Sequence, residues 1–212
     1  MCIPAFVSDG SHEGLLFTDP TILTDKQAIE WIKEIFPSTN PAVYEEIQKY
    51  YPSPQFGTTR YSTEFGRIKS IIEGLLHLKL ISYSLDSIVN CNCLYLARAF
   101  KNNTHNYRFS IPPGIHAMDL IFTFYPMTIT LPTNLFVLPI PLLYARALQS
   151  CFISFVKHGD PNVERRRGTI EWHLFGKEKR IVDVTLLGFW GVKDNQLSED
   201  YCRFWQTATY SV

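Results

Sequence analysis

An alternating, strand-like segment that stops at a Pro-Pro-Gly turn constrains the fold of this chain more than any other feature. Apolar and polar side chains alternate over residues 107–111, which is the pattern of a half-buried strand. The prolines and glycine at 112–114 then end the strand, and His116 follows. A histidine just past a strand end lies at the rim of a sheet, where ligands and catalytic groups collect. On this local pattern alone, a structural role for His116 competes with a functional one.

The rest of the chain alternates strand-like runs with amphipathic helical segments. Further strands are predicted at residues 2–7, which end in a Ser-Asp-Gly loop, and at 180–187. Helices are predicted at 25–36, 40–50, 63–80, 86–100, 142–156 and from 198 onward. Strands separated by long helical segments indicate an α/β layer, but two or three strands do not complete a sheet. We therefore expect an α/β chain that forms part of a fold.

The charge balance and the hydropathy pattern argue against two classes of partner. Twenty basic residues balance twenty acidic ones, so no broad field favours nucleic acid or an anionic membrane surface. The basic cluster at 165–167 lies between turn-forming residues and is interpreted as a solvated loop. Prolines interrupt the apolar stretch at 131–144, so no run reaches the roughly eighteen apolar residues of a membrane helix. We expect no nucleic acid partner, no membrane span and, from the first ten residues, no signal peptide in this chain.

The cysteines and one sequon bear on the compartment in which the chain folds. Five cysteines are an odd number, so at least one thiol stays free in a monomer. Cys91 and Cys93 are separated by one residue, which is a weak metal signal because no pair of Cys-x-x-Cys motifs occurs. Asn102 begins the sequon Asn-Asn-Thr, a glycosylation candidate if a form of this protein enters the secretory route.

Four stretches, taken in chain order, match the motifs of one known family. They are Ser-Asp-Gly-Ser-His-Glu-Gly at 8–14, Gly-Ile-His-Ala-Met-Asp at 114–119, a helix end from 148 to Gly-Asp-Pro-Asn at 159–162, and Cys-Arg-Phe-Trp at 202–205. In this order they resemble the acid loop, the histidine loop, a helix end and the closing motif of the type-B carboxylesterases, the cholinesterase-like branch of the α/β-hydrolases. The resemblance implies that residues 1–212 form the carboxy-terminal part of a carboxylesterase domain. The expected fold class is α/β, a partial α/β-hydrolase fold with an incomplete sheet.

The resemblance assigns catalytic roles to two residues. Glu13 would be the acid of a serine triad and His116 its general base. A serine hydroxyl is a poor nucleophile until an imidazole takes its proton, and the carboxylate holds the imidazole in the correct tautomer. These hydrolases run Ser, then Asp or Glu, then His along the chain, which fits the order of Glu13 and His116. The plain alternative for Glu13 is a solvated loop carboxylate. No cofactor is implied, because a serine triad uses side chains and backbone dipoles.

A disulfide is also implied by the resemblance. The family disulfide near the carboxy terminus maps onto Cys91 and Cys202, with Cys93 as the competing partner. In a reducing compartment no bridge would form, and these residues would be ordinary buried thiols. Members of the family are often secreted.

Two catalytic parts of the family are missing from these residues. Only Gly10 and Gly14 stand four positions apart, and their centre is His12 where a nucleophile elbow needs serine. No two glycines are adjacent, so the glycine-rich oxyanion loop is absent as well. A smaller departure is Ala117, because the family often has glycine after the catalytic histidine, and alanine changes the backbone freedom of the loop.

These absences lead to a prediction of inactivity for the chain alone. An ester substrate would be hydrolysed only if the missing amino-terminal part is supplied. One alternative is a non-catalytic interaction protein. Another is one half of a split esterase, which assembles with a separate amino-terminal half.

Overall fold

The structure, a computed structural model, describes residues 4–12, 15, 19–35, 37, 40–53, 90–124, 142–167, 169–194 and 199–207. The chain forms two compact units. The first comprises Met1–His12 and Tyr95–Asp194, and the second comprises Glu13–Leu94 and Asn195–Val212. The helix predicted at 63–80 lies outside the described residues.

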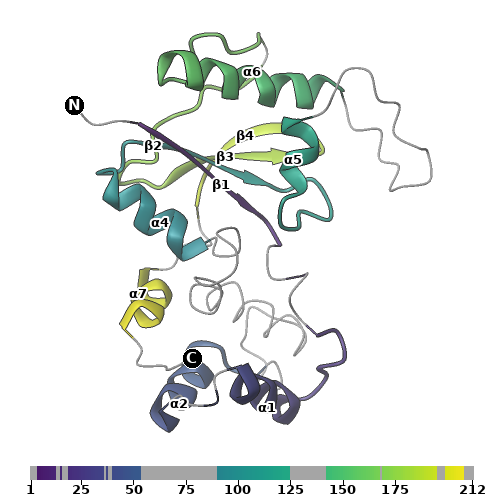
Figure 1. The fold of residues 1–212 in the computed structure, drawn as a ribbon, viewed down its shortest axis with the longest axis vertical. Helices are drawn as coiled ribbons and strands as arrows, with labels where there is room; N and C mark the ends of the chain where they lie inside the picture. Colours follow the sequence, from purple (N-terminus) through teal and green to yellow (C-terminus); the bar gives the residue numbers. More distant parts are fainter. Residues whose placement is uncertain are drawn as a thin grey trace. The chain divides into compact units, whose positions relative to one another are not determined.

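A four-stranded sheet organises the first unit. Its strands stand in the order β1 (Ala5–Gly10), β2 (Thr104–Phe109), β3 (Arg180–Thr185) and β4 (Gly188–Lys193) (Figure 1). The pairs β1–β2 and β2–β3 are parallel, and β3–β4 is an antiparallel hairpin. Gly10 and Val184 are both register partners of Phe109. The carboxyl ends of the three parallel strands therefore meet at one edge of the sheet, where the loops after β1 and β2 begin.

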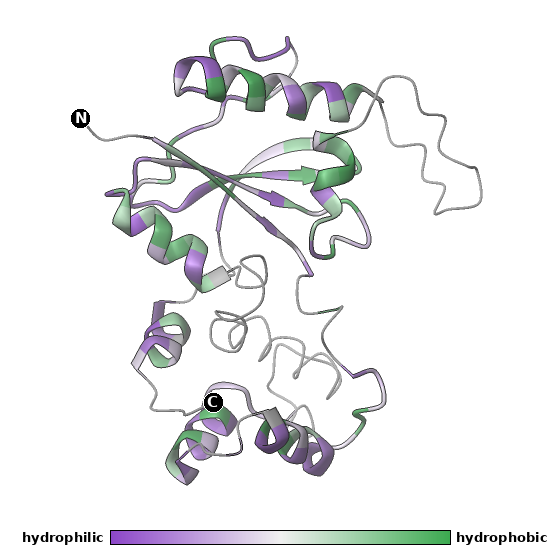
Figure 2. Ribbon diagram, viewed as in Figure 1, coloured by the Kyte–Doolittle hydropathy of each residue, from purple (hydrophilic) through white to green (hydrophobic). Residues whose placement is uncertain are grey.

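One face of the sheet carries the core of the first unit, beneath the helix α6 (Leu142–His158) (Figure 1). The buried members come from β2, β3, α6 and the loops beside them: Tyr107, Phe109, Ile111, Phe122, Ala145, Leu148, Cys151, Trp172, Val182 and Val184. Phe6 of β1 stacks on Trp172 with ring centroids 4.9 Å apart. Hydrophobic and hydrophilic residues alternate along α6 in Figure 2, as expected for a helix with one face in a core.

The opposite face of the sheet carries buried charge. Successive side chains of a strand point to opposite faces, so Arg108 projects away from the core that Tyr107 and Phe109 enter. The Arg108 guanidinium donates to Asp9 on β1 (Nε to Oδ2, 3.3 Å) and to Asp194 after β4 (Nη2 to Oδ1, 2.5 Å). All three side chains are at least nine-tenths buried. Charges buried to this degree need such pairing, since an isolated ion costs far more to desolvate.

The second unit contains a helical core. Its helices α1 (Asp25–Ile35), α2 (Pro41–Tyr50) and α7 (Glu199–Thr207) supply, with adjoining residues, the buried cluster Ile22, Ala28, Ile32, Val43, Ile47, Tyr51, Phe204 and Trp205. Thr24 and Gln27 bond reciprocally at the start of α1, the capping box of a helix. Asn40 caps α2 and Pro41 occupies its first position.

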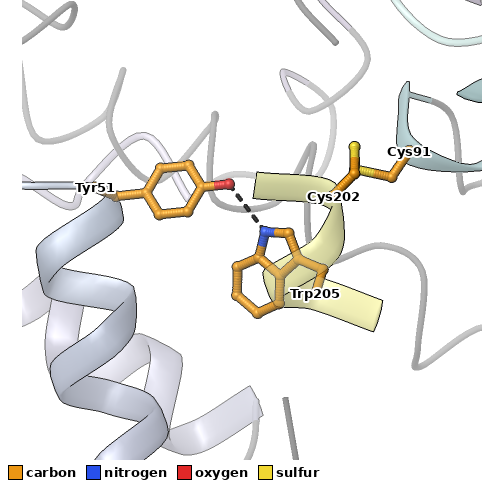
Figure 3. Close-up of a disulfide and its surroundings, with 4 residues drawn as sticks. All are labelled: Tyr51, Cys91, Cys202 and Trp205. Carbon is orange, nitrogen blue, oxygen red and sulfur yellow. Dashed lines mark hydrogen bonds between the residues drawn. A yellow bond between two sulfur atoms is a disulfide. The ribbon is translucent and has the colours of Figure 1, made fainter. Parts of the chain in front are cut away.

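A disulfide and a hydrogen bond hold α7 within this unit (Figure 3). The disulfide joins Cys202 of α7 to Cys91 of α4 (Asn90–Ala99), which is the pairing that the family resemblance implies. The Trp205 indole N–H donates to the Tyr51 hydroxyl at 2.9 Å, between two nearly fully buried rings. Cys93, the competing partner, is buried and takes no part in this disulfide.

The helical predictions that fall on described residues agree with the structure to within a few residues, but the strand predictions need three corrections. β1 includes Ser8, Asp9 and Gly10, which were assigned to a loop. Pairing with β2 and the Arg108 counterion of Asp9 allow the chain to stay extended there. β2 begins at Thr104 and not at 107, because its first three residues are polar but buried. The strand predicted at 180–187 is β3 with its turn, and β4 follows it. A further short helix, α5 (Met118–Thr123), was not predicted.

Candidate active site

His116 lies in the loop between β2 and α5, at the carboxyl edge of the parallel strands. The loop turns at once after β2, and the Gly114 N–H donates to the Ile111 carbonyl at 2.8 Å. Gly114 and Ala117 both adopt left-handed backbone angles, with φ of 63° and 61°. These two turns bracket His116, whose side chain is half-buried and so remains accessible from outside.

Two backbone hydrogen bonds join this loop to the start of the loop after β1. The Ser11 N–H donates to the Phe109 carbonyl at 3.0 Å, and the His12 N–H donates to the Gly114 carbonyl at 2.9 Å. A Cβ on Gly114 would overlap the Ser11 Oγ, so a larger residue would require the Ser11 hydroxyl to rotate away. Glycine at 114 is therefore favoured mainly by its left-handed backbone angle and also by its close neighbour.

A buried tyrosine fixes the other flank of the His116 loop. The Tyr107 hydroxyl donates to Asp119 Oδ2 at 2.6 Å, which ties the first turn of α5 to β2. Burial and then the Asp119 carboxylate raise the pKa of the Tyr107 phenol well above its usual value, so the phenol keeps its proton and remains a donor. Phe122 of α5 packs edge-to-face on Phe109 at 4.8 Å. The histidine is thus held between two anchored segments.

Arg108 and its ion pairs lie next to the point where the loops after β1 and β2 leave the sheet. Arg108 is the register partner of Asp9, and each is the last residue but one of its strand. Burial lowers the pKa of the Arg108 guanidinium, but Asp9 and then Asp194 more than offset this effect and raise it. A permanent cation therefore links the two strands immediately before the loops leave the sheet.

The remaining site predictions fall in different places. Glu13 lies outside the described residues, which end on this side of the loop at His12. Asn102 lies in the turn before β2, at the opposite end of that strand from His116. Cys91 and Cys202 form the disulfide of the second unit. The structure therefore brings the His116 loop against Ser11 and His12.

Three residues that support the site were missed by reasoning from the sequence. Tyr107 was interpreted as an apolar strand residue, and Asp119 was only part of a motif. Their pairing could have been suspected because Asp119 stands three residues after His116, in the first turn of a helix that must face β2. Arg108 was taken as the exposed side of an alternating strand. No local signal reveals that Asp194, 86 residues away, would help to bury it.

Neither a metal centre nor a membrane segment is found in the described part of the chain. No cluster of three His, Cys, Asp or Glu side chains is arranged there to hold a metal ion. None of the described helices is long and apolar enough to cross a membrane. An open hollow of about 660 Å³ lies near the amino end of β2, lined in part by His105, Glu171 and His173, and it does not include His116.

Comparisons with known proteins agree with this geometry. No protein-family model matches the chain. Over 136 residues it is 28% identical to a secreted lipase of Arthroderma benhamiae, covering 60% of this chain and 25% of the lipase. The crystal structure of EstA from Aspergillus niger superposes with a TM-score of 0.73 at 22% identity, covering 97% of this chain and 40% of EstA. A carboxylesterase of Geobacillus stearothermophilus, EST55, gives a TM-score of 0.62 at 20% identity, covering 96% and 39%.

The mixed sheet, its helices and these superpositions show that the fold is a partial α/β-hydrolase fold. Both EstA and the carboxylesterase EST55 share this fold over nearly the whole chain, so the resemblance seen in the sequence is confirmed at the level of the fold. Carboxylesterase- and lipase-like ancestry is likewise supported by the lipase match. The chain spans a quarter of that lipase and about two-fifths of each of the two solved structures.

Proposed function

We propose that this chain carries the acid and the base of a type-B carboxylesterase, with Glu13 as the acid and His116 as the general base of a serine triad. The observation that supports this most directly is the 2.9 Å hydrogen bond from the His12 N–H to the Gly114 carbonyl. It joins the residue before Glu13 to the loop of His116, at the carboxyl edge of parallel strands. The assignment of residues 1–212 to one carboxylesterase-type domain belongs to the same proposal.

In the proposed reaction, the His116 imidazole removes the proton of a serine hydroxyl while the serine oxygen attacks the ester carbonyl. The imidazolium then gives that proton to the departing alcohol, and a water molecule repeats the sequence to release the acid. Glu13 would accept a hydrogen bond from the other ring nitrogen and so fix the tautomer. The half-buried position of His116 suits this role, since its ring must reach both the serine and the leaving group.

The serine nucleophile and the oxyanion donors of the proposed reaction must come from a polypeptide segment other than these 212 residues. These 212 residues contain no Gly-x-Ser-x-Gly and no adjacent glycines. The solved carboxylesterases are more than twice the length that this chain spans in them, so they contain ample additional chain. We propose that this chain is inactive by itself and becomes part of a working hydrolase only with such an amino-terminal part.

The substrate class follows from the names of the similar proteins. Two are described as a carboxylesterase and a lipase, both of which hydrolyse carboxylic esters. A carboxylic ester is therefore the proposed substrate.

The first experiment tests the chain alone. The purified 212-residue chain is incubated with a short-chain aryl ester and, separately, with a fluorophosphonate that labels reactive serines. We expect no labelling and the same rate for the wild type and His116→Ala. Hydrolysis well above that of His116→Ala would contradict the proposed inactivity.

The second experiment supplies the missing part. The chain is fused to the amino-terminal segment of Aspergillus niger EstA, whose fold it shares, and folding is checked by circular dichroism. His116→Ala should lower kcat about 10⁶-fold and Glu13→Gln about 10⁴-fold. His158→Ala, a histidine at the end of α6, is the matched control and should leave kcat unchanged. An active fusion that tolerates His116→Ala would refute the role of the base.

A further inference from the structure

Asn102 lies in the turn between α4 and β2 and is partly exposed. Its backbone is held on both sides, because its N–H donates to the Ala97 carbonyl at 2.7 Å and its carbonyl accepts from the Gly176 N–H at 3.3 Å. The residue has a φ of 60°, in the left-handed region that asparagine tolerates better than most residues. The side chain is half-buried, and no described residue bonds its amide. The backbone is fixed while the amide nitrogen is left available.

Thr104, two residues later, has a hydroxyl that the fold does not use. Its side chain is 0% exposed at the start of β2, and its Oγ1 has no hydrogen-bond partner among the described residues. A buried hydroxyl without a partner loses its hydrogen bonds to water and gains none in return. Valine has the same branched shape and the same preference for strands without this cost. The presence of threonine instead of valine at position 104 is therefore not explained by the contacts of the folded protein.

We propose that Asn102 carries an N-linked glycan, and that the Thr104 hydroxyl is retained because the glycosylating enzyme reads it on the chain before β2 folds. The ligand class is a lipid-linked oligosaccharide diphosphate. The Asn102 Nδ2 forms a bond to the anomeric carbon of the first sugar, and the carbon–oxygen bond to the diphosphate breaks. The lipid diphosphate leaves with the electron pair, and a base in the transferase takes the amide proton. After folding, Thr104 is sealed in the sheet while Asn102 stays at the surface.

The disulfide is an independent indication of the same compartment. Disulfides such as Cys91–Cys202 persist in oxidising compartments, of which the endoplasmic reticulum lumen is the one in which sequons are modified. The helix that carries Cys91 ends at Ala99, three residues before Asn102. Asn102-Asn103-Thr104 is the only Asn-x-Ser/Thr sequon in the sequence, so one glycan is expected.

The glycan would not obstruct the candidate active site. Asn102 precedes β2 and His116 follows it, so the length of a six-residue strand, about 20 Å, separates the two ends. The inference is therefore independent of whether His116 is a catalytic base.

The experiment translates the whole chain, with a secretion signal added, in the presence of microsomes. The wild type should gain the mass of one glycan, and an endoglycosidase should remove it. Asn102→Gln and Thr104→Val should abolish the shift, whereas Thr104→Ser and the matched control Asn103→Gln should keep it. Absence of the shift in the wild type, or its persistence in Thr104→Val, overturns the proposal.

A second measurement separates glycosylation from folding. In chain made without glycosylation, Thr104→Val should unfold at the same temperature as the wild type or at a higher one. A clearly lower unfolding temperature would show that the fold uses the hydroxyl, and it would overturn the argument. In protein from its natural source, the tryptic peptide 102–108 should be recovered only after deglycosylation; recovery of the unmodified peptide in full yield would also overturn it.

Discussion

The Tyr107 hydroxyl donates a 2.6 Å hydrogen bond to Asp119, and this bond fixes the helix that follows His116 to the strand that precedes it. Tyr107 is only 2% exposed, so its phenol has no access to water as an alternative partner. Tyr107 precedes the His116 loop and Asp119 follows it, so their hydrogen bond ties the two ends of the loop together.

Tyr107→Phe should lower the free energy of unfolding by about 1–3 kcal/mol, because it removes the donor and leaves Asp119 without that bond. Urea denaturation measures this change. Tyr144→Phe is the matched control, since its hydroxyl makes a longer, exposed bond of 3.2 Å to the Leu186 carbonyl and should matter little. Equal effects of the two substitutions would contradict the importance assigned to the Tyr107–Asp119 bond.

Arg108→Met should be the more damaging change, by about 3–5 kcal/mol, because it leaves two buried carboxylates without their shared cation. Arg203→Met offers a comparison, since the Arg203–Asp200 pair is 4.0 Å apart and mostly exposed, and its loss should change stability by less than about 1 kcal/mol. A small effect for Arg108→Met would mean that Asp9 and Asp194 are stabilised mainly by other groups.

Ala117→Gly should stabilise the protein, by up to about 1 kcal/mol, because a left-handed backbone costs alanine energy that glycine does not incur. Thermal unfolding should show the gain directly. Ala147→Gly, in the middle of α6, should have the opposite sign and destabilise by about 1 kcal/mol. If both substitutions destabilise, the backbone at position 117 is not strained.

His105 should make stability depend on pH. Burial lowers the pKa of its imidazole, against an opposing effect of Asp160 and with a smaller lowering effect of His173. The unfolded chain then binds a proton near the ordinary value of 6.5 while the folded chain resists it, so stability is full above that pH and falls as the pH decreases below it. The slope contributed by one such group is at most about 1.4 kcal/mol per pH unit.

Urea denaturation of the wild type and of His105→Gln at about pH 7.5 and about pH 5.5 measures this contribution. The wild type should lose more stability on acidification than the variant. Equal losses would assign the acid sensitivity to other groups.

The sequence predicted the helices well because each carries its own signals. Thr24 with Gln27, and Asn40 with Pro41, mark helix starts within a few residues of the chain, and the structure uses both. The end of β1 was misjudged because the burial of Asp9 depends on Arg108, 99 residues away. The polar start of β2 was misjudged because these residues pair with β1, a segment far away in the sequence. β4 was missed because its residues, Gly-Phe-Trp-Gly-Val-Lys, show no clear alternation.

The candidate site was predictable only in part for the same reason. His116 could be placed at the end of a strand because an alternating segment and a Pro-Pro-Gly turn precede it in the sequence. The supporting bonds of Tyr107 and Arg108 depend on where α5 and Asp194 fold, which no local pattern records. The catalytic role of Glu13 remains a prediction of the resemblance.

The Cys91–Cys202 disulfide also has a topological consequence. It closes a covalent ring across a sequence separation of 111, and Tyr95–Asp194, the larger segment of the sheet-containing unit, lies wholly within that ring. A single peptide-bond cleavage at any point between the two cysteines would open the ring without releasing a fragment. The two products would stay together on a non-reducing gel and separate only when a thiol is added, so nicked chain would be counted as intact unless it is reduced.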